Sequence, residues 1–216
     1  MGYPEHKEHF NIAYKTGTDT WTHPSTVTEG KKFIEKLTGG ANILDVGSGR
    51  GFFAKHLAGL GFKVIGIDFA KDVVEKANTN VADWGLGGKL KFVEADVLNI
   101  PFVDAGFDAV CDFGLFETLY KEDWPAYAKE INRVLKPGGL YLNVSLSRET
   151  QHFFEFSPKA GTDVDFEKYR IHYHFFGEDE MKTIFLGKFE VISQKTEFAK
   201  TDEKIILLET LFQKPK

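Results

Sequence analysis

Short apolar runs alternate with amphipathic stretches along the middle of the chain. Each run has the length of a buried strand, whereas each amphipathic stretch carries apolar residues at helical spacing. Strands that alternate with helices are typical of a parallel sheet with right-handed crossovers. The runs predict strands over 42–46, 63–68, 89–94, 107–111 and 140–146. The amphipathic stretches predict helices over 27–37, 51–60, 70–82 and 122–135.

The C-terminal part has a different order of elements. A helix is expected over 178–186, and two strands, 188–196 and 203–213, follow it with only a short turn between them. So short a link forces the two strands to pair antiparallel. The pattern therefore predicts the α/β class, with a mostly parallel sheet that ends in an antiparallel hairpin.

The composition is that of one globular domain. A chain of 216 residues is long enough to bury a sizeable core. Its formal net charge is −5 and it has no basic run, so a nucleic-acid partner is not expected. No apolar run approaches the roughly 18 residues of a membrane span, so no membrane partner is expected. The single cysteine, Cys111, favours a reducing compartment, and we expect a cytoplasmic protein.

The first predicted strand ends in three glycines at alternate positions, Gly47, Gly49 and Gly51, and a helical pattern follows at once. This order puts a helix N-terminus and bare backbone at the carboxyl end of the strand, where nucleotides bind. The dinucleotide fingerprint needs a sixth-position glycine, but Phe52 stands there. The loop therefore favours a nucleoside-like ligand without a pyrophosphate. A turn that only lets strand and helix pack closely is the alternative.

Acidic residues end the next two apolar runs. Asp68 follows Gly47 by about 20 residues, the spacing at which a carboxylate on the second strand meets ribose hydroxyls. A carboxylate suits this role because it accepts from both hydroxyls of a diol. Capping of the helix over 70–82 is the other role open to Asp68. Asp96 should lie beside the other strand ends, where it could accept from an amine of an adenine ring, or lie in a solvated turn.

Five segments in order resemble the class I S-adenosylmethionine-dependent methyltransferases: DVGSGRG, GIDFA, EADVLNIPF, FDAVCDFGLFETL and VLKPGGLYLNVS. The resemblance covers about half of the chain, over 42–147. It implies S-adenosylmethionine as the cofactor and a Rossmann-like methyltransferase fold. That fold is a three-layer sandwich around a seven-stranded, mostly parallel sheet, closed by an antiparallel C-terminal hairpin. Dinucleotide-binding domains usually lack this hairpin, so it separates the two classes independently of the glycine loop.

The same resemblance implies roles for segments that follow the strands. The glycine loop lines the methionine moiety, Asp68 and Phe69 hold the ribose and the adenine, and 112–114 opens beneath the sulfonium. Aromatic residues before the first strand form a candidate lid. The implied cofactor-binding residues are Tyr14, Trp21, Asp45, Gly47, Ser48, Gly49, Gly51, Asp68, Phe69, Asp96, Val97, Asp112, Phe113 and Gly114.

The segment 147–176 is the least regular long stretch, and a connection of this length is usually functional. Its many aromatic residues predict a cover over the sheet edge and an apolar acceptor pocket, or else a small satellite core. His172 and His174 would share one face of a strand, but no third ligand is evident, so no metal is expected. A protonated acceptor would need a general base. The candidate bases are Glu117, His152, His172 and His174.

The sequence thus predicts one methyltransferase domain in four parts. These are an N-terminal lid and helix (1–40), a cofactor-binding core (41–147), a substrate-covering insert (148–177) and a closing helix and hairpin (178–216). The expected activity is direct in-line transfer of a methyl group to a small molecule, in a monomer or homodimer. The alternatives are a protein side chain as acceptor, an aminopropyltransferase on this fold, an NAD-dependent oxidoreductase and a non-catalytic regulator.

Overall fold

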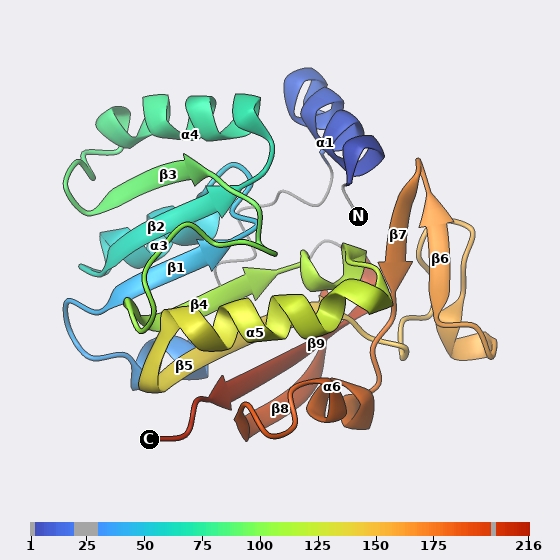
Figure 1. Cartoon of the computed structure of the whole chain (residues 1–216). Coiled ribbons are helices and arrows are strands. Elements are labelled where there is room, and N and C mark those ends of the chain that lie inside the picture. The colour runs from blue at the N-terminus through green and yellow to red at the C-terminus, as the bar shows by residue number, and fades with distance from the viewer. Residues whose placement is uncertain (1–2, 20–29, 200–201) are drawn as a thin grey trace.

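The computed structural model describes residues 3–19, 30–199 and 202–216. A seven-stranded sheet forms the centre, in the order β3-β2-β1-β4-β5-β9-β8 (Figure 1). The first five strands along the chain pair in parallel, whereas β9 is antiparallel to both of its neighbours. The predicted fold class, including the closing hairpin, is confirmed. The strands are β1 (Asn42–Val46), β2 (Lys63–Asp68), β3 (Leu90–Glu94), β4 (Phe107–Phe113), β5 (Leu135–Leu146), β8 (Glu190–Ala199) and β9 (Asp202–Gln213).

Helices cover both faces of the sheet and complete a three-layer sandwich. One apolar core joins the sheet to α2, α3 and α4, and a second core joins its other face to α5 and α6. Both cores are rich in buried β-branched and aromatic side chains, whose burial is the main favourable contribution to folding. The helices are α1 (Pro4–Thr16), α2 (Lys31–Lys36), α3 (Phe52–Gly59), α4 (Lys71–Asp83), α5 (Trp124–Val134) and α6 (Glu178–Ile184).

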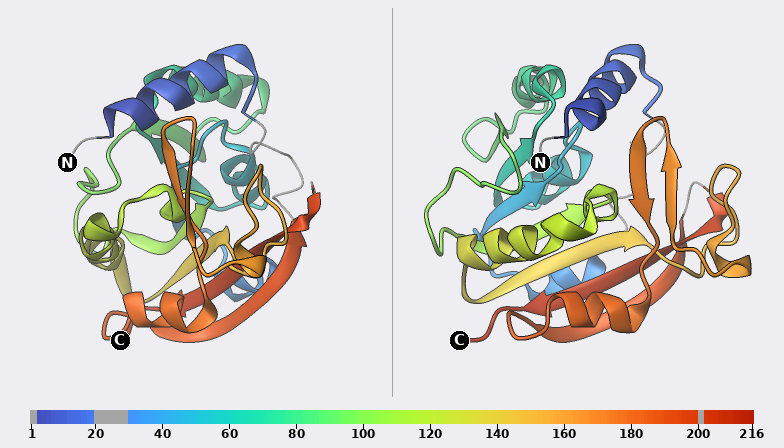
Figure 2. Two further views of the ribbon diagram at one scale, coloured as in Figure 1. Left: turned by 90° about the vertical axis from the view of Figure 1, so that its right-hand side faces the viewer. Right: turned by 45° about the vertical axis from the view of Figure 1, so that its right-hand side comes forward.

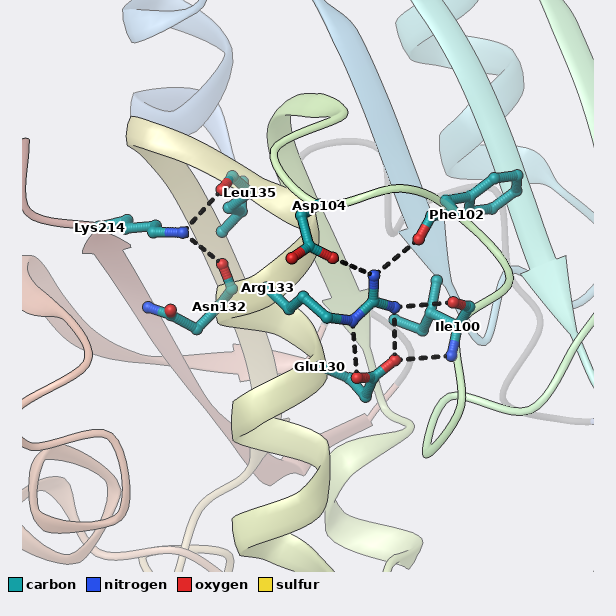
Figure 3. A network of polar contacts seen from close by, with 8 residues as sticks. All are labelled: Ile100, Phe102, Asp104, Glu130, Asn132, Arg133, Leu135 and Lys214. Carbon is teal, nitrogen blue, oxygen red and sulfur yellow. Dashed lines mark hydrogen bonds and ion pairs between the residues drawn. The ribbon is translucent and has the colours of Figure 1, made fainter.

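A polar network fastens the long connection between β3 and β4 to the end of α5 (Figure 3). Arg133 donates to the backbone oxygens of Ile100 and Phe102, at 2.8 and 2.7 Å. Its guanidinium also forms ion pairs with Glu130 and Asp104. Lys214 donates to the carbonyls of Asn132 and Leu135 at the C-terminus of the helix. The Arg133 bonds hold the segment that follows Asp96 against the body of the domain.

One helix and one hairpin were not predicted. The first is α1, in a stretch that the sequence shows only as polar and aromatic; its buried residues His6, Ala13 and Tyr14 recur at helical spacing. The second is a hairpin of β6 (Asp165–Lys168) and β7 (Ile171–His174) within the irregular segment. The sequence interpretation was also wrong about the start of β5, which pairs from Leu135 onward across an irregularity in register.

The unpredicted elements stand over the carboxyl edge of the parallel strands. The arrowheads of β1 to β4 point toward α1 and the β6–β7 hairpin (Figure 1), and Figure 2 shows α1 crossing above the edge with the hairpin in front of it. None of the helices in the described ranges is long and apolar enough to cross a membrane. Trp21 and the start of the helix expected over 27–37 lie outside the described residues.

Candidate active site

A cavity of about 300 Å³ opens at the carboxyl edge of the sheet. The strand order reverses between β1 and β4, and such a switch point is where open α/β sheets bind ligands. One end of the cavity, here called the donor end, is formed by the segments that follow β1 to β4. Of the predicted cofactor-binding residues, those that line the cavity are Tyr14, Gly47, Asp68, Phe69, Asp96, Val97, Phe113 and Gly114.

The glycine loop adopts a backbone that only glycine takes up easily. Gly47, Gly49 and Gly51 have φ angles of 67°, 49° and 78°. A Cβ atom at Gly51 would collide with the ring of Phe92, so this glycine serves close packing. A Cβ atom at Gly49 would lie 2.8 Å from the hydroxyl of Tyr14. Gly47 is the loop glycine that lines the cavity itself, so the loop serves both packing and the site.

Asp68 both bonds to the start of the following helix and faces the cavity, the two positions that the sequence left open. Its two carboxylate oxygens accept from the amides of Gly49, at 3.0 Å, and Ala70, at 2.9 Å, so it ties the glycine loop to the start of α4. It also lines the cavity. Burial raises its pKa to about 6, and the amide bonds limit the rise, so the carboxylate is mostly charged at neutral pH. Each oxygen keeps a lone pair for a ligand hydroxyl.

The remaining charged candidates lie behind the cavity wall. Asp45 accepts a hydrogen bond from the thiol of Cys111, and burial raises its pKa to about 7. Asp112 accepts from the hydroxyl of Tyr127 and the amide of Leu115, and burial raises its pKa to about 6. Both are nearly or completely buried. Neither lines the cavity, so in this structure they support the loops rather than face a ligand.

Ser48 has no hydrogen-bond partner for its buried hydroxyl among the described residues. Its backbone amide is bonded to Ile67, and the side chain lies close to Gly66. Ser48, Gly49 and Gly51 do not line the cavity, although they build the loop that does.

Helix α1 forms the roof of the cavity. Tyr3, His6, Phe10 and Tyr14 all line it, and they form one stripe of the helix. The helix is fastened to the body of the domain by the Tyr3 hydroxyl, which donates to Asp123 at 2.6 Å. Tyr14 was chosen from the sequence, but the other three were missed. Their helical spacing was the signal that could have identified them.

The opposite end of the cavity, here called the acceptor end, is apolar apart from a few side chains. Glu117 follows β4 in a short 3-10 helix, η2 (Phe116–Thr118), and lines the cavity. Desolvation, with a contribution from the nearby Asp112 charge, raises its pKa to about 8. Its Oε2 atom is buried and has no partner in the described part of the chain. The apolar and aromatic residues around it are Leu146, Phe153, Phe154, Tyr173, Ile205 and Leu207.

The three histidines proposed as bases do not line the cavity. His152 is exposed. His172 and His174 lie on the other face of β7 from Tyr173, which does line it. They share one strand face as expected, and Asp165 lies beside both. Asp165 was not identified from the sequence, because it lies on the neighbouring strand β6. Of the candidate bases, Glu117 is the one that the fold brings to the cavity.

The donor end suits S-adenosylmethionine on chemical grounds. The cavity volume is within the range of small-molecule sites. Asp68 offers acceptor lone pairs at the end of the second strand, and Phe69 and Val97 provide apolar surface beside it. Gly47 lines the cavity as well, and a Cβ atom there would collide with the side chain of Leu115, so a glycine lets the loop and the segment after β4 pack closely at this wall.

Comparison with known proteins agrees with this geometry. Residues 43–139 match the family model described as a methyltransferase domain. In this central part the chain is similar to the S-adenosylmethionine-dependent methyltransferases. Its sequence is 33% identical over 158 residues to the ubiquinone/menaquinone biosynthesis C-methyltransferase UbiE of Pseudomonas fluorescens, over 65% of this chain and 60% of that protein. It is 32% identical to the sterol 4-C-methyltransferase strm-1 of Caenorhabditis elegans, over 55% of this chain and 35% of that protein.

Solved structures share the architecture of this chain. The 1,6-didemethyltoxoflavin-N1-methyltransferase of Burkholderia thailandensis, solved with its substrate and S-adenosylhomocysteine, superposes with a TM-score of 0.82 at 18% identity, over 100% of this chain and 92% of that one. A methyltransferase from Methanosarcina mazei gives a TM-score of 0.74 at 24% identity, over 86% and 97% of the two chains. At these identities the likeness establishes the fold alone. The chain spans about 60% of the length of the UbiE protein that it matches.

Proposed function

We propose that this protein transfers a methyl group from S-adenosylmethionine to a small, largely apolar acceptor. The observation that carries the proposal is that one cavity joins the glycine loop and Asp68 at one end to Glu117 and an aromatic wall at the other. The acceptors named for two similar proteins, a sterol and 1,6-didemethyltoxoflavin, are small molecules. A pocket of this volume with a mostly apolar lining suits such a molecule.

In this proposal the donor end holds the cofactor through groups that are already in place. Asp68 accepts from the ribose hydroxyls, because its oxygens retain lone pairs beyond the two amide bonds. Asp96 and Val97 take the adenine edge and face, and Phe69 packs against the ring. Gly47 and Gly114 offer bare backbone to the methionine part. Asp45 and Asp112, which lie behind the wall, act by holding the loops.

S-adenosylmethionine supplies a methyl group that its sulfonium has already activated. The remaining contribution of the protein is to align the acceptor and to exclude water, which is the usual source of catalysis by orientation. The roof formed by α1 and the apolar acceptor end serve both purposes. Glu117 accepts the proton that a protonated acceptor must lose. A carboxylate with a pKa of about 8 is a strong enough base for this and is partly ionised at neutral pH.

Calorimetry with three ligands tests the donor end. We expect S-adenosylmethionine and S-adenosylhomocysteine to bind and NAD to give no heat of binding. Binding of NAD alone would contradict the proposal and favour an oxidoreductase. A clear preference for decarboxylated S-adenosylmethionine would favour the aminopropyltransferase instead.

A screen for the acceptor tests the other end. The protein is incubated with S-adenosylmethionine and with sets of apolar and aromatic metabolites, and formation of S-adenosylhomocysteine is followed. We expect turnover with apolar small molecules that carry an acidic O–H, N–H or C–H group. Turnover with peptides alone would place the acceptor on a protein.

The proposal also includes the cytoplasm as the compartment, because the single cysteine is a buried free thiol. It includes a monomer or homodimer as the assembly.

A further inference from the structure

We propose that the β6–β7 hairpin binds one divalent transition-metal ion through Asp165, His172 and His174. None of the three side chains lines the cavity, although the His172 amide lies 3.5 Å from Nε2 of His6, which does, and the proposal does not depend on the proposed methyl transfer. The three side chains lie on the face of the hairpin that points away from the cavity. Among the described residues they form the one group of three or more histidines, cysteines and acids whose ligand atoms lie within 4.8 Å of one another.

The pairing of the two strands creates this group. Asp165 lies directly opposite His174 in the antiparallel ladder, and His172 is two residues away on the same face. The Oδ1 atom of Asp165 is 2.7 Å from Nδ1 of His174 and 3.5 Å from Nε2 of His172. Three ligand atoms on one small face can therefore converge on a single ion with small side-chain movements, because zinc–ligand bonds are about 2.0–2.2 Å long.

One buried atom in the group makes no hydrogen bond among the described residues. The Nε2 atom of His172 is buried and makes no hydrogen bond within the described residues, although it faces the Asp165 carboxylate. Without an ion, hydrogen bonds to the carboxylates of Asp165 and Glu180 would account for His174. The buried Nε2 atom of His172 would still lack a hydrogen bond, which is costly. An ion bound by both imidazoles would give each histidine a partner.

Neighbouring side chains orient His174 and Asp165, as outer groups orient the ligands in metal-binding proteins. The second ring nitrogen of His174 lies 3.1 Å from Oε1 of Glu180 in α6, and metal-bound histidines are usually oriented by such a carboxylate. Lys121 donates to Oδ2 of Asp165 at 2.9 Å, which leaves Oδ1 facing the histidines. The two carboxylates outweigh the one ammonium, so the local charge favours a cation. Trp124 packs against the His174 ring at 4.9 Å and shields it from water.

The donor set selects the class of metal. Two imidazoles and one carboxylate suit Zn²⁺ and its neighbours such as Co²⁺, whereas Mg²⁺ and Ca²⁺ prefer oxygen ligands alone. The ion would brace the hairpin rather than take part in chemistry at the cavity. Tyr173 lies between the two histidines in sequence and lines the acceptor end, so the brace would hold one wall of that end.

Metal titration of the full chain tests the site. The purified protein is freed of metal with a chelator and titrated with ZnCl₂ by calorimetry, and with Co²⁺ while visible absorption is recorded. We expect one ion per chain and the ligand-field bands of Co²⁺ with nitrogen ligands. His172→Ala should weaken binding more than about 100-fold, and Glu180→Gln about 10–100-fold, because an outer carboxylate only orients its ligand.

His152→Ala is the matched control, since it removes an exposed histidine elsewhere in the same insert and should leave the affinity unchanged. Circular dichroism of each variant confirms folding, and His172 is preferred over the fully buried His174 for this reason. The proposal is overturned if the folded wild type binds no ion, or if His172→Ala binds as tightly as the wild type. Loss of binding in His152→Ala to the same extent would also overturn it.

Discussion

The two ends of the cavity are built from different parts of the protein. At the donor end, loops follow directly from parallel strands, and main-chain amides hold the Asp68 carboxylate. At the acceptor end, the lining comes from η2, the end of β5, the insert and β9, and it consists of packed side chains around Glu117. The donor end is preorganised for one ligand. The acceptor end is defined mainly by its side chains.

The largest effect is expected from a substitution of Glu117. We expect Glu117→Gln to lower kcat/KM about 10²–10⁴-fold for an acceptor that must lose a proton, because the amide cannot accept it. The dissociation constant of S-adenosylhomocysteine should stay the same, since Glu117 belongs to the other end. An equal loss of cofactor affinity would show that the two ends are not separate.

The pH profile of the same variant gives a second readout. A base must be ionised to act, and burial raises the pKa of Glu117 to about 8. The wild-type kcat/KM should therefore rise as the pH increases through about 8 and level off above it. Glu117→Gln should lose this rise. A rise that persists in the variant would assign the titration to another group.

At the donor end we expect Asp68→Ala to weaken binding of S-adenosylhomocysteine by about 1–3 kcal/mol, the usual scale for loss of charged hydrogen bonds. The ratio of rates for two different acceptors should not change. Asp83→Ala, an exposed carboxylate at the end of α4, is the control and should bind like the wild type. Thermal unfolding of each variant separates lost binding from lost folding. Unchanged affinity in a folded Asp68→Ala protein would refute the ribose role.

The smallest effect is expected at the aromatic wall. Phe153 packs against Tyr173 and Phe175, with ring centroids 5.1 and 5.5 Å away. Phe153→Ala should raise KM for an apolar acceptor about tenfold, as expected for lost apolar contact in a pocket. Binding of S-adenosylhomocysteine, measured by calorimetry, should stay as in the wild type. A larger effect on the cofactor than on the acceptor would reverse the assignment of the two ends.

The difference between the donor end and the acceptor end also explains how much of the site could be predicted from the sequence. The glycine loop and Asp68 are adjacent to their strands, so a local pattern identifies both the elements and their shared edge. The placement of Glu117 was accessible in the same way, because it follows β4. The three predicted helices of the core and all seven strands of the sheet are confirmed, with ends shifted by a few residues.

The rest depended on contacts between distant segments. His172 and His174 were visible as a pair, but Asp165 joins them only through the turn of the hairpin. His6 reaches the cavity only because α1 folds back across the sheet edge. Asp45 looked like a ligand-facing acid, and its burial beside Cys111 depends on the pairing of β1 with β4. Such relations are set by tertiary packing, which periodicity does not encode.

The position of Cys111 allows opening of the central sheet to be measured through the reactivity of its thiol. Its thiol lies in β4, next to β1, fully buried, and its pKa is raised well above the usual value by burial and by the neighbouring Asp45. A thiol reagent attacks the thiolate, so it must wait until these strands separate. Because the chain has only one cysteine, the alkylation rate reports how often the centre of the sheet opens, without any introduced probe.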